Sequence, residues 1–152
     1  MALLTLILVV AACGDDADGI TVEGAWARNS PIAAAAGAGY MQLTSPVDDV
    51  LVGIAVEASF ARAGELHDVI MVESTDTTMA GSMDVGEGMM MVAIDTIPLP
   101  ADETVVLEPG HLHLMFVGLM EPLETGDTFE VTLQFETAAD MVVEFEVFEE
   151  AP

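Results

Sequence analysis

The chain has 152 residues, of which 27 are acidic and only 2 are basic, for a formal net charge of −25 at neutral pH. Such a charge repels polyanions and attracts cations, so nucleic acid is excluded as a partner. A solvated acidic surface suited to high salt explains the same charge without any ligand. Cys13 is the only cysteine, and once it is lipidated the folded domain has none, which excludes a disulfide framework, cysteine-based zinc and iron–sulfur centres, and a blue-copper centre. Any metal in the folded domain must therefore use His, Met or carboxylate ligands.

The beginning of the chain has the pattern of an export signal. Residues 1–12 form an apolar run that is too short to span a bilayer and ends in small residues. The tetrapeptide Val-Ala-Ala-Cys that ends at Cys13 resembles the lipobox of bacterial lipoproteins, whose cysteine is acylated. We therefore expect a signal peptide over 1–12, an acylated Cys13, a flexible tether over 13–19 and a domain over 20–150. The domain would be extracytoplasmic and anchored to the cell membrane, on its periplasmic or outer face; a plain signal peptide with an incidental cysteine is the alternative.

Most of the domain has the composition of short β-strands separated by Gly, Pro and Asp turns. Strands are predicted, in chain order, over 40–43, 50–60, 103–110, 110–119, 128–136 and 141–149. In the last two, apolar and polar residues alternate, which indicates one buried face and one solvated face. The alanine run over 31–39 is interrupted by Gly37 and Gly39 and is predicted to be a loop. The chain is therefore expected to be all-β, a Greek-key sandwich or barrel that buries its core without disulfides.

A methionine-rich segment interrupts the strand pattern between residues 71 and 91. It holds six of the eleven methionines of the chain: Met71, Met79, Met83, Met89, Met90 and Met91. Methionine normally fills hydrophobic cores, yet this segment is otherwise rich in Gly, Ser, Thr and Asp. We expect a flexible loop in which packing does not explain the methionines.

The segment HLHLM, His111 to Met115, combines two histidines with a methionine. On a strand over 110–119, the side chains of His111, His113 and Met115 would project from one face, about 7 Å apart at each step. Neighbouring side chains at that spacing can converge on one ion, and a set that contains thioether sulfur favours Cu(I) over zinc, calcium or magnesium. His67, the only other histidine, and a methionine from 71–91 would complete a set of two His and two Met. A strand that merely contains structural histidines is the alternative.

These residues resemble the PCu(A)C family of periplasmic copper chaperones, whose pattern is a His, then a Met, a spacer and His-x-Met. Here 21 residues separate Met91 from His113, and Met115 completes the His-x-Met. The flanking sequence also resembles the family in four segments: AWARNSP, GELH, IPLPADETVVLEPGHLHLMFVGL and GDTFEVTLQFE. The resemblance covers roughly residues 20–148, and it includes Trp26, which we expect to pack rather than to bind metal.

The resemblance implies a cupredoxin-like β-sandwich that carries Cu(I) and catalyses no reaction. It implies the ligands His67, Met91, His113 and Met115. The gap between His67 and Met91 is longer than the basic spacing of the family, which leaves Met89 or Met90 possible in place of Met91. His111 stands where the family often has glycine, so it is at most an additional ligand or a transfer residue.

The resemblance also implies a recipient, the copper centre of a haem–copper oxidase such as cytochrome c oxidase, and we expect a monomer that passes Cu(I) on by ligand exchange. Two other functions fit the residues. One is copper sequestration for tolerance, in which the methionine-rich segment binds additional ions. The other is a metal-free sandwich that acts as a scaffold at the membrane.

Overall fold

The computed structural model describes residues 19–30, 35–71, 83–86 and 88–152. Within these ranges every regular element is a β-strand, which confirms the predicted all-β class. No helix in this part of the chain is long and apolar enough to cross a bilayer. The predicted signal peptide over 1–12, the lipidation site Cys13 and nearly all of the tether over 13–19 lie outside the described residues.

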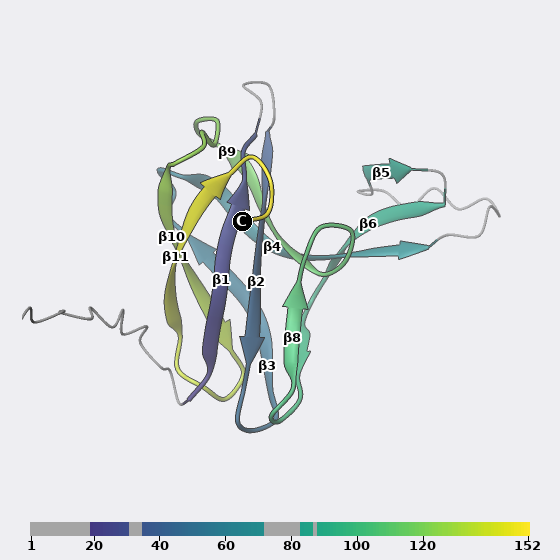
Figure 1. Ribbon diagram of the computed structural model, residues 1–152, viewed down its shortest axis with the longest axis vertical. Coiled ribbons are helices and arrows are strands. Elements are labelled where there is room, and N and C mark those ends of the chain that lie inside the picture. Colours follow the sequence, from purple (N-terminus) through teal and green to yellow (C-terminus); the bar gives the residue numbers. More distant parts are fainter. Residues whose placement is uncertain (1–18, 31–34, 72–82, 87) are drawn as a thin grey trace, which may run out of the picture.

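The strands form a single, strongly curved sheet that is folded into a sandwich (Figure 1). Its hydrogen-bonded order is β5-β6-β4-β9-β2-β1-β11-β10-β3-β7, and β8 pairs with β2. β4 and β3, which are far apart in this order, come face to face: a Cβ on Gly64 of β4 would lie only 2.5 Å from the side chain of Ile54 of β3. The strands are β1 (Thr21–Arg28), β2 (Ala36–Thr44), β3 (Asp49–Val56), β4 (Ala61–Met71), β5 (Met83–Gly86), β6 (Met89–Ile94), β7 (Ile97–Leu99), β8 (Thr104–Leu107), β9 (His113–Leu119), β10 (Thr128–Phe135) and β11 (Met141–Phe148).

The core lies between the two layers and is built by the predicted alternation of β10 and β11. Val131, Leu133 and Phe135 of β10 are buried. The same holds for every second residue of β11 from Met141 onward, whereas the glutamates between them are exposed. Phe145 stacks on Phe129, with ring centroids 5.7 Å apart. Burial of one face of each strand therefore follows from the period of two in the sequence.

The predicted loop over 31–39 is wrong in its second half, because β2 begins at Ala36. The two glycines that suggested a loop lie inside the strand. A Cβ on Gly37 would lie 2.8 Å from Leu123, and a Cβ on Gly39 would lie 2.9 Å from Phe116. These glycines let large core side chains pack directly on the backbone of β2.

The methionine-rich segment is not a loop throughout. β4 continues to Met71 and β6 begins at Met89, so the described parts of the segment are mostly strand. Beyond His67, β4 has left β9 and pairs only with β6, which pairs with β5 on its other side. We call residues 68–71 and 89–92 the arm. The arm projects sideways from the sandwich (Figure 1).

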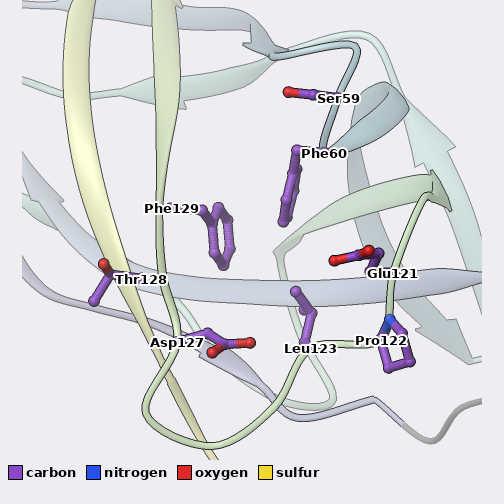
Figure 2. Close-up of a pocket in the computed structure, with 8 residues that line it drawn as sticks. All are labelled: Ser59, Phe60, Glu121, Pro122, Leu123, Asp127, Thr128 and Phe129. Carbon is purple, nitrogen blue, oxygen red and sulfur yellow. The ribbon is translucent and has the colours of Figure 1, made fainter.

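A pocket of about 190 Å³ opens beyond the C-terminal end of β9, whereas His113 lies at the N-terminal end of this strand. The rings of Phe60 and Phe129 stack on each other with centroids 4.2 Å apart, and Glu121 and Asp127 lie at the pocket rim (Figure 2). Asp127 already accepts a hydrogen bond from the backbone N–H of Glu124 (3.1 Å). The pocket is thus separated from the histidines by the length of β9.

Asp49, at the start of β3, ties this strand to the connection between β10 and β11. Its buried carboxylate accepts hydrogen bonds from the backbone N–H groups of Val50 (2.8 Å), Thr137 (3.0 Å) and Ala138 (2.9 Å). Burial raises the pKa of this carboxyl, but the hydrogen bonds outweigh burial, and the net pKa is below the ordinary value. Asp49 therefore stabilises the fold only when it is ionised.

Replacing Asp49 with alanine is expected to lower the free energy of unfolding by about 2 kcal/mol at pH 7, because three backbone donors lose their acceptor. Since the folded pKa is lowered, the contribution is complete above the ordinary value of 3.8 and is lost as the pH falls through the folded value. Urea denaturation of the wild type and the variant, at constant salt, measures both effects.

The exposed Asp140, near the same connection, supplies the control variant Asp140→Ala, which should unfold like the wild type. Equal stability of Asp49→Ala and the wild type at pH 7, or a difference that grows in acid, would show that Asp49 is not a carboxylate anchor.

Candidate metal centre

The centre of the candidate site is a pair of facing histidines on adjacent strands. His67 of β4 and His113 of β9 are directly opposite in register, and their ring centroids lie 5.6 Å apart. The residues are 8% and 3% exposed. Two imidazoles that hold one ion through nitrogen atoms, at about 2.0 Å each, have ring centres on the order of 5 to 6 Å apart. The spacing therefore suits a shared metal ion.

The alternation of β9 places its two candidate metal ligands away from the main core. Leu114 and Phe116 are fully buried between the layers. His113 and Met115 occupy the alternate positions and point to the other face of the sheet, as the sequence predicts. Met115 pairs with Glu65 and is 6% exposed, so the thioether stands next to the histidine pair in a largely dry position.

His113 is held in a form that can bind a metal. Its Nδ1–H donates a hydrogen bond to the backbone carbonyl of His111 (2.7 Å), which leaves the lone pair on Nε2. Burial lowers the pKa of His113, and the nearby His67 lowers it further, although the bond to His111 acts in the opposite direction. The ring is therefore neutral and fixed in one tautomer, the state of a metal-binding imidazole.

His67 has one nitrogen bonded and one without a partner. Its Nε2 lies 2.8 Å from Oε2 of Glu65, and donation to that carboxylate leaves the lone pair on Nδ1. Nδ1 of His67 is a buried atom with no hydrogen-bond partner, the one such side-chain atom in the described part of the chain. A buried polar atom without a partner costs free energy, and a metal ion would satisfy it.

The register of β6 separates the three consecutive methionines of the predicted set. Met91 pairs with Val69, two residues along from His67, so it lies on the same face and one diagonal step away. Diagonal neighbours on a sheet are about 7 to 8 Å apart, within reach of a long side chain. Met90 pairs with Ile70 and points to the opposite face, while Met89 is two residues farther out. Of the three, Met91 is therefore the one that can meet the histidines.

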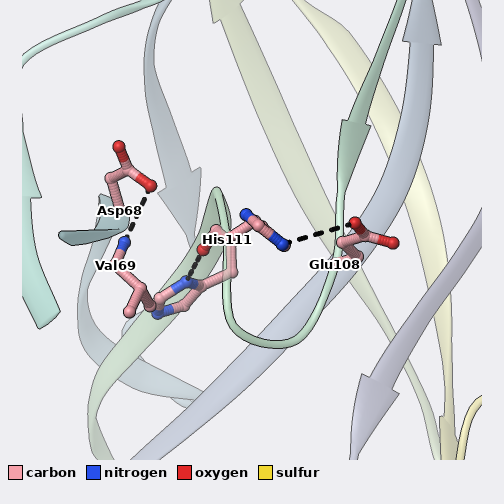
Figure 3. A network of polar contacts seen from close by, with 5 residues as sticks. Asp68, Val69, Glu108 and His111 are labelled. Atoms are coloured by element: carbon pink, nitrogen blue, oxygen red, sulfur yellow. Dashed lines mark hydrogen bonds and ion pairs between the residues drawn. The ribbon is translucent and has the colours of Figure 1, made fainter. Parts of the chain in front are cut away.

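His111 does not share the face of His113, contrary to the expectation from a strand over 110–119. The strand begins only at His113, after a turn that contains Gly110 with φ of +88°. The side chain of His111 is 70% exposed and lies 3.9 Å from that of Glu108 (Figure 3). Its contribution to the site is the carbonyl oxygen that orients His113.

Two side chains beside the histidines were not assigned to the site from the sequence. The ring centroid of Tyr40 of β2 lies 6.4 Å from that of His113. Glu65 is the hydrogen-bond partner of His67. Glu65 could have been found, because it lies two residues before His67 and therefore on the same face; Tyr40 is placed only by the pairing of β2 with β9. Trp26 packs on Tyr40, with ring centroids 4.6 Å apart. The aromatic rings shield one side of the site from water.

The described residues contain no group of three His, Cys, Asp or Glu side chains that could hold a metal ion. The register instead sets the imidazoles of His67 and His113 next to the thioether of Met115, with Met91 one diagonal step away. Such a set is chemically soft and suits Cu(I) better than the hard cations calcium and magnesium.

Comparison with known proteins places the chain in a lipoprotein family. The family described as "Putative lipoprotein LpqE-like" matches residues 20–147. A relative from Leifsonia xyli subsp. xyli (strain CTCB07), "Putative lipoprotein Lxx21020", is 30% identical over 122 residues, which is 80% of this chain. The match spans 65% of that relative, slightly less than two thirds of its length.

Solved structures with the same fold are domains that bind copper or their metal-free forms. The copper-bound PCuAC domain from PmoF2 is 24% identical with a TM-score of 0.61, over 88% of this chain and 93% of that one. The apo PCuAC domain from PmoF1 is 21% identical with a TM-score of 0.65, over 92% of this chain and 100% of that one. CuI-DR1885 from Deinococcus radiodurans is 28% identical with a TM-score of 0.56, over 91% and 83%. The chain belongs to the LpqE-like lipoprotein family, and its fold is the cupredoxin-like β-sandwich of PCuAC domains.

Proposed function

We propose that this domain is a copper carrier that binds one Cu(I) through His67, Met91, His113 and Met115. The observation that carries the proposal is the pair of facing imidazoles, each with one nitrogen occupied by a hydrogen bond and the other left with a lone pair. The likeness to CuI-DR1885 supports the choice of Cu(I). The domain catalyses no reaction in this account, since its buried histidines serve as ligands.

The four ligands have complementary roles. The imidazoles of His67 and His113 supply two nitrogens that are already oriented by Glu65 and by the carbonyl of His111. The thioethers of Met91 and Met115 supply soft sulfur, which stabilises Cu(I) without a cysteine. A ligand set without thiols also suits an oxidising compartment.

Release follows from the unequal burial of the ligands. His67, His113 and Met115 are buried, whereas Met91 is only half buried and lies at the base of the arm. An acceptor can therefore replace Met91 first and the buried ligands afterwards. Copper remains Cu(I) throughout, so the transfer requires neither an electron nor a proton donor.

The LpqE-like family consists of lipoproteins, which supports an extracytoplasmic domain held at the membrane through Cys13. The resemblance to PCu(A)C chaperones favours the copper centre of a haem–copper oxidase as the acceptor. A sequestering protein would instead hold several Cu(I) ions with similar affinity, and a metal-free scaffold would melt at the same temperature with and without Cu(I).

In an anaerobic competition with a Cu(I) chelator, the wild type is expected to bind one Cu(I) tightly. The double variant His113→Ala/Met115→Ala should lose at least about 100-fold in affinity, because it removes a nitrogen and a sulfur from the ligand set.

Two matched variants control for the loss of any His or Met. His111→Ala removes an exposed histidine, and Met90→Leu removes a methionine that points to the opposite face; both should bind Cu(I) like the wild type. An unchanged affinity of the His113→Ala/Met115→Ala variant would refute the proposed site.

Glu65 is expected to act as a positioning residue for His67. Glu65→Leu removes the acceptor that fixes the His67 ring, and loss of such a partner lowers metal affinity about 10-fold or more. Asp68→Asn is the control, because Asp68 follows His67 but bonds the backbone N–H of Val69 (2.7 Å; Figure 3). Equal Cu(I) affinities of Glu65→Leu and Asp68→Asn would mean that Glu65 does not orient the ligand.

Acid should destabilise the metal-free protein through His113. Because burial lowers the pKa of His113 below its ordinary value of 6.5, the unfolded chain takes up a proton here at a higher pH than the folded chain. The stability that neutral His113 confers is complete above about pH 7 and is lost as the pH falls through 6.5 toward the folded value. The difference in free energy of unfolding between the wild type and His113→Gln should therefore shrink from pH 7.5 to pH 5; a constant difference would show that His113 is not desolvated.

A further inference from the structure

Two methionines face each other at the exposed end of the arm. Met71 of β4 and Met89 of β6 are directly opposite in register, and they are 79% and 42% exposed. Side chains directly opposite on an antiparallel pair have Cβ atoms about 4.5 to 5.5 Å apart, so two thioether sulfurs can meet one ion there. With this exposure, neither side chain contributes much to the core.

This methionine pair lies on the same face of the sheet as the candidate metal centre. On β4, Met71, Val69 and His67 are successive alternate residues, and the register with β6 runs from Leu66 to Met71 without a shift. On β6, Met89 and Met91 are likewise successive alternate residues. Met91 therefore stands between the exposed pair and the histidines, about 7 Å from Met89 along the strand.

We propose that Met71 and Met89 form a second Cu(I) site, through which the ion enters and leaves the histidine site with Met91 as the shared ligand. The inference extends the proposed function, because it gives the route by which the buried site exchanges copper. The site is assigned from residues 71, 89 and 91 alone.

The two sites differ in strength for a physical reason. The pair on the arm offers only thioethers in an exposed position, whereas the inner site adds two oriented imidazoles and a buried thioether. An ion bound by Met71, Met89 and Met91 can therefore move inward by exchanging Met71 and Met89 for His67 and His113 while Met91 stays bound. The ion remains Cu(I), and only coordination bonds form and break. The large negative charge of the chain favours capture of the cation.

Nuclear magnetic resonance of methionine methyl groups tests the site directly. The full-length chain, labelled with ¹³C at the methionine methyls, is titrated anaerobically with up to two equivalents of Cu(I). The first equivalent should shift the methyl resonances of Met91 and Met115, and the second should shift those of Met71 and Met89. Met90, on the opposite face, and the exposed Met120, on the loop after β9, should not move with either equivalent.

Two double variants test the route. Met71→Leu/Met89→Leu should abolish binding of the second equivalent of Cu(I). It should also slow transfer of Cu(I) from its bicinchoninate complex to the protein at least several-fold, while the affinity for the first equivalent stays unchanged. Met90→Leu/Met120→Leu removes the same number of methionines and should behave like the wild type. Met71, Met89 and Met120 are exposed and Met90 is half buried, and none of the four belongs to the hydrophobic core, so both variants should fold.

The outcomes separate this inference from the proposed function. If the first equivalent binds at His67 and His113 but the second does not shift Met71 and Met89, the inference is overturned and the proposed function stands. If the methyls of Met71 and Met89 respond while His113→Ala has no effect, the inner site is wrong and the arm alone binds copper. Equal transfer rates for the two double variants would overturn the route.

Discussion

The register of β4 against β9 is the constraint on which the rest of the structure depends. It sets His67 directly opposite His113 on the face of the sheet that turns away from the main core. Because side chains alternate along a strand, a slip of one residue in either strand would send one histidine between the layers and bring a leucine to the other face. The core residues Leu66 and Leu114 resist that slip, since both are almost completely buried. The hydrophobic pattern that builds the sandwich thus also positions the two histidines proposed as ligands.

Different hydrogen bonds orient the two histidines. His113 is fixed by a carbonyl from the turn just before its own strand, and His67 is fixed by a carboxylate two residues earlier on the same face. Each bond leaves the other ring nitrogen with a lone pair, and burial keeps His113 neutral by lowering its pKa. The unpartnered Nδ1 of His67 is costly in a fold without metal. A bound ion would remove this cost, so the metal-free fold itself contributes to the proposed affinity for an ion.

The fold class and the opposite orientations of Leu114 and His113 could be predicted, because both follow from a period of two in apolar residues. Strand ends were less predictable. Gly37 and Gly39 suggested a loop, although they lie in β2 where Phe116 and Leu123 need the space of a missing Cβ. His111 was expected on the same face as His113 because the strand was predicted to begin at residue 110. The sequence does not show that it begins only at His113. The choice of Met91 over its neighbours depends on the pairing of β6 with β4, a long-range register that a single sequence does not contain. Tyr40 stands beside the site through another long-range register, that of β2 against β9.

The proposed copper site combines nitrogen and sulfur ligands on this face of the sheet. X-ray absorption at the copper edge, on the full chain loaded anaerobically with one equivalent of Cu(I), counts these neighbours directly. We expect two nitrogen and two sulfur neighbours, and the loss of one of each in His113→Ala/Met115→Ala. A first shell without sulfur, or a shell that the double substitution leaves unchanged, would contradict it.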